Sequence, residues 1–84
     1  MSTSLKLKIV SPEKIVYDGE VEHVVLPGSM GEFQVLPNHA PIISALENGV
    51  IVYKPIGNVE DKIEVTGGFV EVQNNDVNIC VELK

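Results

Sequence analysis

The chain has 84 residues, of which 44% are hydrophobic, and this length supports one compact domain but not two. Six lysines, no arginine and twelve acidic residues give a formal net charge of -6 at pH 7. That balance argues against DNA, RNA or an anionic lipid surface as a partner, because such binding needs clustered cations, and it favours a basic partner. The single cysteine, Cys80, excludes an internal disulfide framework.

The N-terminal stretch MSTSLKLK lacks both the apolar run of a signal peptide and the arginines of an organelle transit peptide. No apolar run approaches the roughly 20 residues that a membrane-spanning helix needs. The sequence therefore predicts a chain of the bacterial cytosol, which can still lie beside a membrane.

Alternation with period two dominates the first half of the chain. Residues 5–10 read LKLKIV, with leucine and isoleucine on one face and lysine on the other, which indicates a half-buried strand. We expect a short strand at 14–17 that stops at Asp18-Gly19, another at 20–26 before Pro27-Gly28, and a brief extended piece at 31–36.

The second half continues the pattern. Residues 42–55, IISALENGVIVYKP, predict two strands joined at Asn48-Gly49, a dipeptide that suits a tight hairpin. A further hairpin surrounds PIGNVED, with its return strand at 62–66, and Gly67-Gly68 separates that strand from FVEVQ at 69–73. A turn at 74–76 leads to VNICVEL at 77–83, where valine and isoleucine alternate with polar residues.

Many short strands, frequent turns and no amphipathic helical stretch indicate an all-β fold, either a sandwich or a flattened barrel. There is no repeat, linker or low-complexity tract, so residues 1–84 are predicted to form a single domain.

One segment, GEFQVLPNHAP at 31–41, combines a carboxylate, an aromatic ring, a histidine and two prolines. Prolines on both sides of His39 restrict the backbone and hold the imidazole in a defined direction. Catalysis at His39 would need a nucleophile or a second acid–base group, and the nearby sequence offers only Glu32 and Ser44. No nucleophile-elbow signature is present, although a catalytic set assembled from distant residues stays open.

Metal and phosphate sites are disfavoured by spacing. His23, His39 and Cys80 are the only soft or borderline ligands, and none lies at the spacing of a zinc motif. Gly67-Gly68 precedes a strand rather than a helix, so a turn or bulge is favoured over a phosphate-binding loop. The remaining hypothesis for residues 31–41 is a rigid surface loop that offers Glu32 to a basic partner.

The run PGSMGEFQVLPNHAP at 27–41, followed by TGGFVEV at 66–72, resembles the N-terminal domain of the epsilon subunit of rotary proton-translocating (F-type) ATP synthases. The opening LKLKIVSPEKIVYDGEVEHVVLPG is similar to the first strands of that family, so the resemblance covers essentially the whole chain. It implies a flattened β-sandwich of about ten short strands in two sheets.

The resemblance also implies a function. Epsilon subunits of this family belong to the central rotor, bound to the gamma subunit and resting on the c-ring, and they turn with both while proton flow drives ATP synthesis. It implies a non-catalytic subunit without cofactor or metal, peripheral to the cytoplasmic face of the bacterial inner membrane as part of the ATP synthase complex.

Matching the motifs residue by residue gives three expected contact regions. Ser29, Met30, Gly31 and Glu32 correspond to the loop that faces the c-ring. His39, Ala40 and Pro41 correspond to the segment near the ring and gamma, and Ile9, Val10 and Ser11 correspond to the edge near gamma.

The sequence departs from many relatives by ending at Lys84, directly after the last predicted strand. If this is the natural length, we expect no C-terminal helical hairpin and hence neither helix-based inhibition of ATP hydrolysis nor ATP sensing. The alternative function from the residues alone is a free-standing β-sandwich module that binds a peptide or small ligand through Glu32 and His39.

Overall fold

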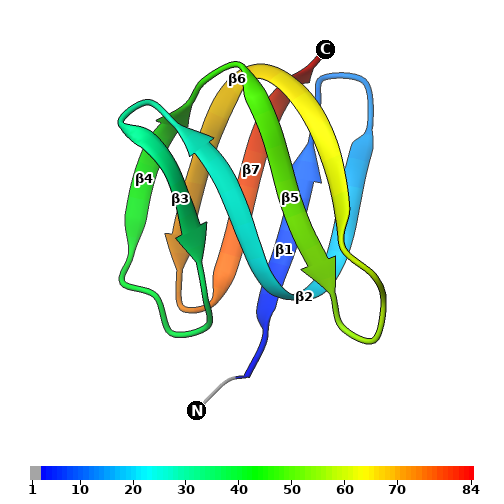
Figure 1. The fold of residues 1–84 in the computed structure, drawn as a ribbon, viewed down its shortest axis with the longest axis vertical. Helices are drawn as coiled ribbons and strands as arrows, with labels where there is room; N and C mark the ends of the chain where they lie inside the picture. The colour runs from blue at the N-terminus through cyan, green and yellow to red at the C-terminus, as the bar shows by residue number, and fades with distance from the viewer. Residues whose placement is uncertain (1–2) are drawn as a thin grey trace.

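The computed structural model describes residues 3–84, and within that range it contains seven β-strands and no helix (Figure 1). The strands are β1 (Leu5–Val10), β2 (Ile15–Gly28), β3 (Gly31–Val35), β4 (Ile42–Leu46), β5 (Gly49–Pro55), β6 (Asp61–Gln73) and β7 (Asp76–Leu83). Since those residues form no helix at all, they include none that could cross a membrane. The all-β prediction is confirmed, with seven strands in place of about ten.

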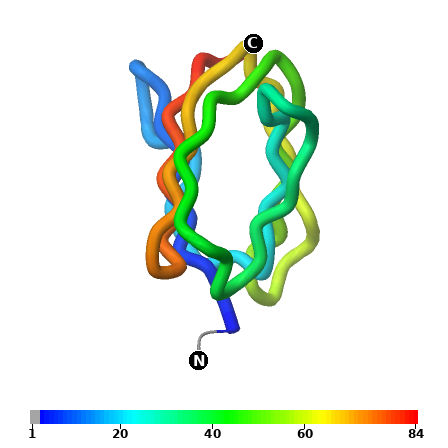
Figure 2. Tube along the Cα trace, turned by 90° about the vertical axis from the view of Figure 1, so that its left-hand side faces the viewer, coloured from blue at the N-terminus to red at the C-terminus, as the bar shows by residue number. Residues whose placement is uncertain are grey.

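The strands form a flattened sandwich of two layers (Figure 2), with principal extents of 34 × 25 × 19 Å. We call one layer sheet I; it contains β4, the second half of β6, β7, β1 and the first half of β2. The other layer, sheet II, contains β3, the second half of β2, β5 and the first half of β6. All pairs are antiparallel except β1 with β7, which is parallel.

Two long strands, β2 and β6, pass from one sheet to the other, and this explains the lower strand count. The pairing register shifts between Val21 and His23 in β2 and between Val65 and Gly67 in β6, so each strand bends at a bulge. Asp18-Gly19 and Gly67-Gly68 were expected to end strands, but both lie inside continuous ones. Gly67 lies at the bulge of β6, where the missing side chain permits a sharp corner, whereas Gly19 pairs with Leu7 in regular register before the bend of β2.

No tight hairpin forms at Asn48-Gly49, where the sequence predicts one. β4 and β5 are not paired with each other: β4 pairs with β6 and β5 pairs with β2 and β6, so Asn48-Gly49 joins two sheets. Two-residue hairpins instead connect β2 to β3 at Ser29 and Met30, and β6 to β7 at Asn74 and Asn75. The φ angles of the two asparagines, 51° and 65°, suit a type I′ turn. Asparagine tolerates these left-handed angles better than other residues with a side chain. The predicted hairpin around PIGNVED is confirmed.

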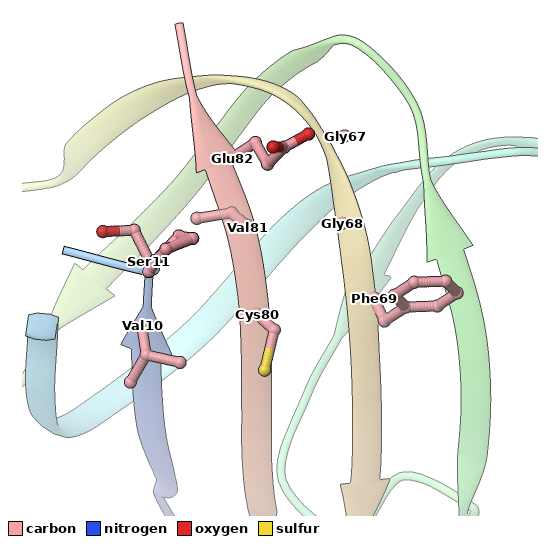
Figure 3. Close-up of a pocket in the computed structure, with 9 residues that line it drawn as sticks. Val10, Ser11, Gly67, Gly68, Phe69, Cys80, Val81 and Glu82 are labelled. Carbon is pink, nitrogen blue, oxygen red and sulfur yellow. The ribbon is translucent and has the colours of Figure 1, made fainter. Parts of the chain in front are cut away.

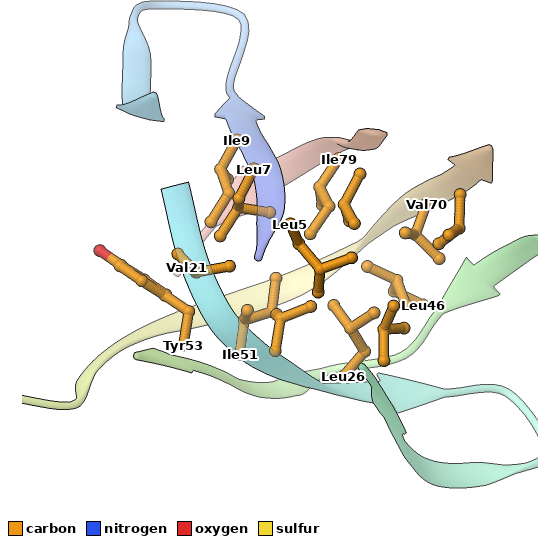
Figure 4. Close-up of a cluster of buried hydrophobic side chains, with 14 of the residues drawn as sticks. Leu5, Leu7, Ile9, Val21, Leu26, Leu46, Ile51, Tyr53, Val70 and Ile79 are labelled. Carbon is orange, nitrogen blue, oxygen red and sulfur yellow. The ribbon is translucent and has the colours of Figure 1, made fainter. Parts of the chain in front are cut away.

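The hydrophobic core lies between the two sheets (Figure 4). It is formed by alternate residues of the strands, as in β7, where Val77, Ile79 and Val81 are buried while Asn78 and Cys80 are exposed. No polar or charged residue in the described range is buried. The remaining fully or nearly fully buried residues are Leu5, Leu7, Ile9, Val21, Val24, Leu26, Val35, Leu46, Ile51, Tyr53, Val65, Val70 and Val72.

Candidate docking site

The β2–β3 hairpin carries the predicted contact Ser29–Glu32 at one end of the molecule (Figure 1). Ser29 and Met30 form the turn. Residues 29–32 are all exposed, and the Met30 side chain is completely exposed. Gly31 has a φ of 122°, which other residues rarely adopt, so the turn needs glycine at this point. Backbone bonds from Ser29 N–H to Ala45 O (3.3 Å) and from Glu47 N–H to Pro27 O (2.7 Å) hold the hairpin against β4. The tip is therefore a firmly anchored projection.

Two carboxylates mark the end of the molecule that carries this tip. Glu32 is exposed and makes no ion pair within residues 3–84, and Glu47 is exposed in the β4–β5 connection beside the hairpin. Two carboxylates elsewhere are paired: Glu22 lies 3.0 Å from Lys54 Nζ, and Glu60 lies 3.5 Å from His23 Nε2. Glu32 is thus available to an external cation.

His39, Ala40 and Pro41 lie at the opposite end of β3 from Glu32, in the β3–β4 loop (Figure 1). The half-buried His39 imidazole donates from Nδ1 to the Ala40 carbonyl oxygen at 2.7 Å. The loop is tied to the β6–β7 turn, since Asn38 N–H donates to Asn75 Oδ1 (2.6 Å) and Asn75 Nδ2 donates to Asn38 Oδ1 (3.3 Å). The predicted contact regions at Ser29–Glu32 and His39–Pro41 are close in sequence, but the length of β3 separates them in space.

This separation removes a local catalytic pair of Glu32 and His39, because the length of β3 lies between them. The Ser44 hydroxyl donates to the Ala45 carbonyl oxygen at 3.1 Å. In the part of the chain that the structure describes, no group of three His, Cys, Asp or Glu side chains is placed to hold a metal ion.

The outer face of sheet I carries a feature that the sequence did not reveal. Ile15 pairs with Val10, Val10 with Cys80, Cys80 with Phe69, and Phe69 with Ala45, so one row crosses five strands. We call this row the apolar band. Phe69 is 65% exposed and Ile15 59%, although they belong to the largest apolar side chains of the sheet.

The band continues along β4 through Ile43, which is 78% exposed, to Pro41. Beside the band the next row is polar: Lys8 pairs with Asp18 and with Asn78, and Asn78 pairs with Glu71. An exposed apolar strip with a polar border is typical of a protein–protein contact.

A shallow groove of about 490 Å³ lies along the middle of the band (Figure 3). Val10, Cys80 and Phe69 line it from three neighbouring strands, together with Ser11. Gly67 and Gly68 add no side chains to its floor. A Cβ on Gly68 would collide with the Cys80 carbonyl oxygen, so close approach of β6 and β7 requires glycine there. The predicted gamma contacts Val10 and Ser11 thus line a groove that only the fold creates, whereas Ile9 is fully buried and offers no side chain to a partner.

Two tyrosines near the β2 bend are the groups whose acidity the fold shifts. The rings of Tyr17 and Tyr53 lie 4.6 Å apart. Burial, and then the charges of Asp18 and Asp61 respectively, raise the pKa of each phenol above its ordinary value. Their placement is structural, since Tyr53 belongs to the core.

Comparison with known proteins gives a consistent result. The family described as "ATP synthase, Delta/Epsilon chain, beta-sandwich domain" matches residues 4–83. The chain is 52% identical over 82 residues to the ATP synthase epsilon chain of Desulfitobacterium hafniense, covering 98% of this chain and 61% of the relative. It is 46% identical over 78 residues to that of Leptospira borgpetersenii, covering 93% and 61%. The chain thus spans about three-fifths of the length of these relatives.

Solved structures with the same fold belong to mitochondrial assemblies. A chain of the Euglena gracilis ATP synthase OSCP/F1/c-ring structure superposes with a TM-score of 0.90 at 20% identity, over 96% of this chain and 52% of that one. A chain of the Tetrahymena thermophila ATP synthase central stalk and c-ring structure gives a TM-score of 0.77 at 19% identity, over 93% and 63%. At these identities the likeness establishes the fold.

Proposed function

Because the chain belongs to the ATP synthase delta/epsilon β-sandwich family, we propose that it is a non-catalytic rotor component of a proton-translocating ATP synthase. In this role it docks on the gamma subunit and the c-ring, and it couples rotation driven by protons to ATP synthesis in the catalytic head. The observation that carries the proposal is the apolar band, which gives this small acidic domain a surface for a partner.

The gamma subunit is the proposed partner of the outer face of sheet I. The band offers Phe69 as a large aromatic anchor and a groove beside it, and aromatic anchors supply most of the affinity in many interfaces. Val10 and Ser11, which the family resemblance assigns to the gamma side, line this same groove. Pro41 lies farther along the same face, next to Ile43. We therefore assign the His39–Pro41 segment to gamma rather than to the ring.

The c-ring is the proposed partner of the hairpin tip. Ser29, Met30, Gly31 and Glu32 project together, and Glu32 offers a carboxylate to a basic or amide group of a polar ring loop. An exposed ion pair contributes about 0–1 kcal/mol, so Glu32 orients the domain on the ring while the apolar band holds it to gamma. Such a subunit lies at the cytoplasmic face of the bacterial inner membrane as a peripheral part of the complex.

Site-directed crosslinking in the assembled ATP synthase tests both contacts. Cys80 lies in the band, so the native thiol serves as the probe for gamma, and the ring experiment needs Glu32→Cys in a Cys80→Ser background. We expect Cys80 to crosslink to gamma and Glu32→Cys to a cysteine in the ring loop. Lys62→Cys, exposed on sheet II, is the matched control and should crosslink to neither.

The result that would overturn the proposal is equally specific. If the chain fails to co-purify with gamma and the ring, the function becomes that of a separate β-sandwich binding module. Crosslinking of Lys62→Cys to gamma with none from Cys80 would move the docking face to sheet II.

A further inference from the structure

We propose that the open edge of β3 binds an extended, basic segment of a partner protein by strand addition. Among residues 3–84, β3 is the one strand that pairs with a single neighbour, β2. The other six strands each have at least two neighbours, although β4 meets β2 at one residue pair, Gly28 with Leu46. Through that pair β1, β7, β6, β4 and β2 close into a ring. β3 lies outside this ring and forms a border of the sandwich (Figures 1 and 2).

Backbone geometry determines which groups this edge offers. The two-residue turn brings Gly28 opposite Gly31, and in an antiparallel hairpin the hydrogen-bonded pairs then alternate along the strand. Gly31, Phe33 and Val35 therefore direct their peptide groups toward β2. The peptide N–H and C=O groups of Glu32 and Gln34 point the other way, where a further strand can pair with them.

Side chains along the edge specify the chemistry of the added strand. Phe33 and Val35 face inward, while Glu32 and Gln34 are exposed. Exposed apolar side chains stand at both ends, with Met30 before the strand and Leu36, 50% exposed, after it. A complementary segment is extended, carries lysine or arginine opposite Glu32, and has apolar residues at its ends.

Charge decides between this partner and a second copy of the chain. Each copy has a net charge of -6, and a carboxylate on an open edge is a recognised device against pairing of identical edges. The same carboxylate attracts a basic strand. Glu47 lies at this end too and strengthens the negative field there.

Synthetic peptides and the full 84-residue chain test the proposal, without any other ATP synthase subunit. The probe is a peptide of about eight residues, a typical strand length, with leucine at both ends, threonine between them and lysine at two central positions. The matched control has glutamate in place of lysine. Two further peptides carry N-methyl groups on one or the other set of alternate amides, because methylation removes the donor that a strand needs.

We expect the lysine peptide to bind at least about tenfold more tightly than the glutamate peptide. We expect one methylation pattern to weaken binding by about tenfold and the other to leave it unchanged. Amide exchange should slow at Glu32 and Gln34. Glu32→Lys should reverse the preference between the two peptides, while Gln34→Pro, which removes an edge N–H, should lose binding and Gln34→Ala should keep it.

Several outcomes would overturn strand addition. One is the absence of binding by the lysine peptide at about 1 mM, the weakest affinity worth assigning to a contact. Others are binding that ignores both methylation patterns, or exchange protection over the apolar band instead of β3. Failure here leaves the rotor proposal intact, since that proposal is tested by crosslinking in the complex.

Discussion

The apolar band on sheet I and the β2–β3 hairpin tip are both exposed surfaces with proposed partners, yet they are built in opposite ways. The tip is one continuous piece of chain, residues 29–32, polar or charged except for Met30. The band joins one row of residues from five strands, extended along β4 to Ile43 and Pro41, and its side chains are apolar. The comparison suggests a division of roles in which the band supplies affinity and the tip supplies orientation.

The largest effect is expected at Phe69, the aromatic side chain of the band. Phe69→Ser should weaken gamma binding by about 2 kcal/mol or more, because it removes an aromatic anchor. Its effect on the free energy of unfolding should stay within about 0.5 kcal/mol, since the ring is 65% exposed. Binding titrations and urea unfolding measure the two quantities. Glu71→Ser, on the same face of β6, is the control, and an equal loss of binding there would break the distinction.

The next effect tests the backbone beneath the groove. Gly68→Ala should destabilise the fold by about 1–3 kcal/mol, because the new methyl group collides with the Cys80 backbone. At Gly67 the nearest atom to an added Cβ is the Leu46 carbonyl oxygen at 3.5 Å, an ordinary contact. Gly67→Ala should therefore cost less than half as much in urea unfolding. Equal costs would show that the groove does not depend on close approach of β6 and β7.

A smaller change is expected at the β6–β7 turn, remote from the tip. Asn75→Ala should cost about 1 kcal/mol of unfolding free energy, because alanine tolerates a φ of 65° poorly and the bonds to Asn38 are lost. Crosslinking at Glu32 should be unaffected. Asn78→Ala, exposed in β7, is the matched control and should be nearly neutral.

The tip itself should respond weakly. Glu32→Gln should reduce binding to the ring by about 0–1 kcal/mol, with the difference disappearing at high salt, as for an exposed ion pair. Affinity measured at two salt concentrations checks this expectation. A loss as large as that from Phe69→Ser would reverse the assignment of roles.

Near pH 7 the smallest effect belongs to the tyrosine pair, which touches neither surface. A raised pKa means that the folded state favours the neutral phenol, so its stabilisation is complete below pH about 10 and is lost as the pH rises further. Tyr53→Phe should reduce the fall in stability above that pH, as followed by urea unfolding at stepped pH. A slope that is the same in both proteins would contradict the assignment to Tyr53.

Sequence alone determined the fold class, the alternation of inward and outward faces at residues 5–10 and 77–83, and the position of a turn after Pro27-Gly28. These depend on local alternation and on turn residues, which a chain carries in its own order. Resemblance to a family predicts Val10 and Ser11 as gamma contacts, and the structure places both beside the groove on sheet I. Sequence alone misjudged Asn48-Gly49, because a dipeptide that permits a tight turn does not determine which strands pair on either side of it.

Tertiary structure alone decided how distant positions meet. It turned Gly67-Gly68 from an expected strand end into a bend, placed His39 a strand's length from Glu32, and aligned Ile15, Val10, Cys80, Phe69 and Ala45 into one band. The physical reason is that pairing register between strands is a long-range property, and a shift of one residue would turn each of these side chains to the other face of the sheet.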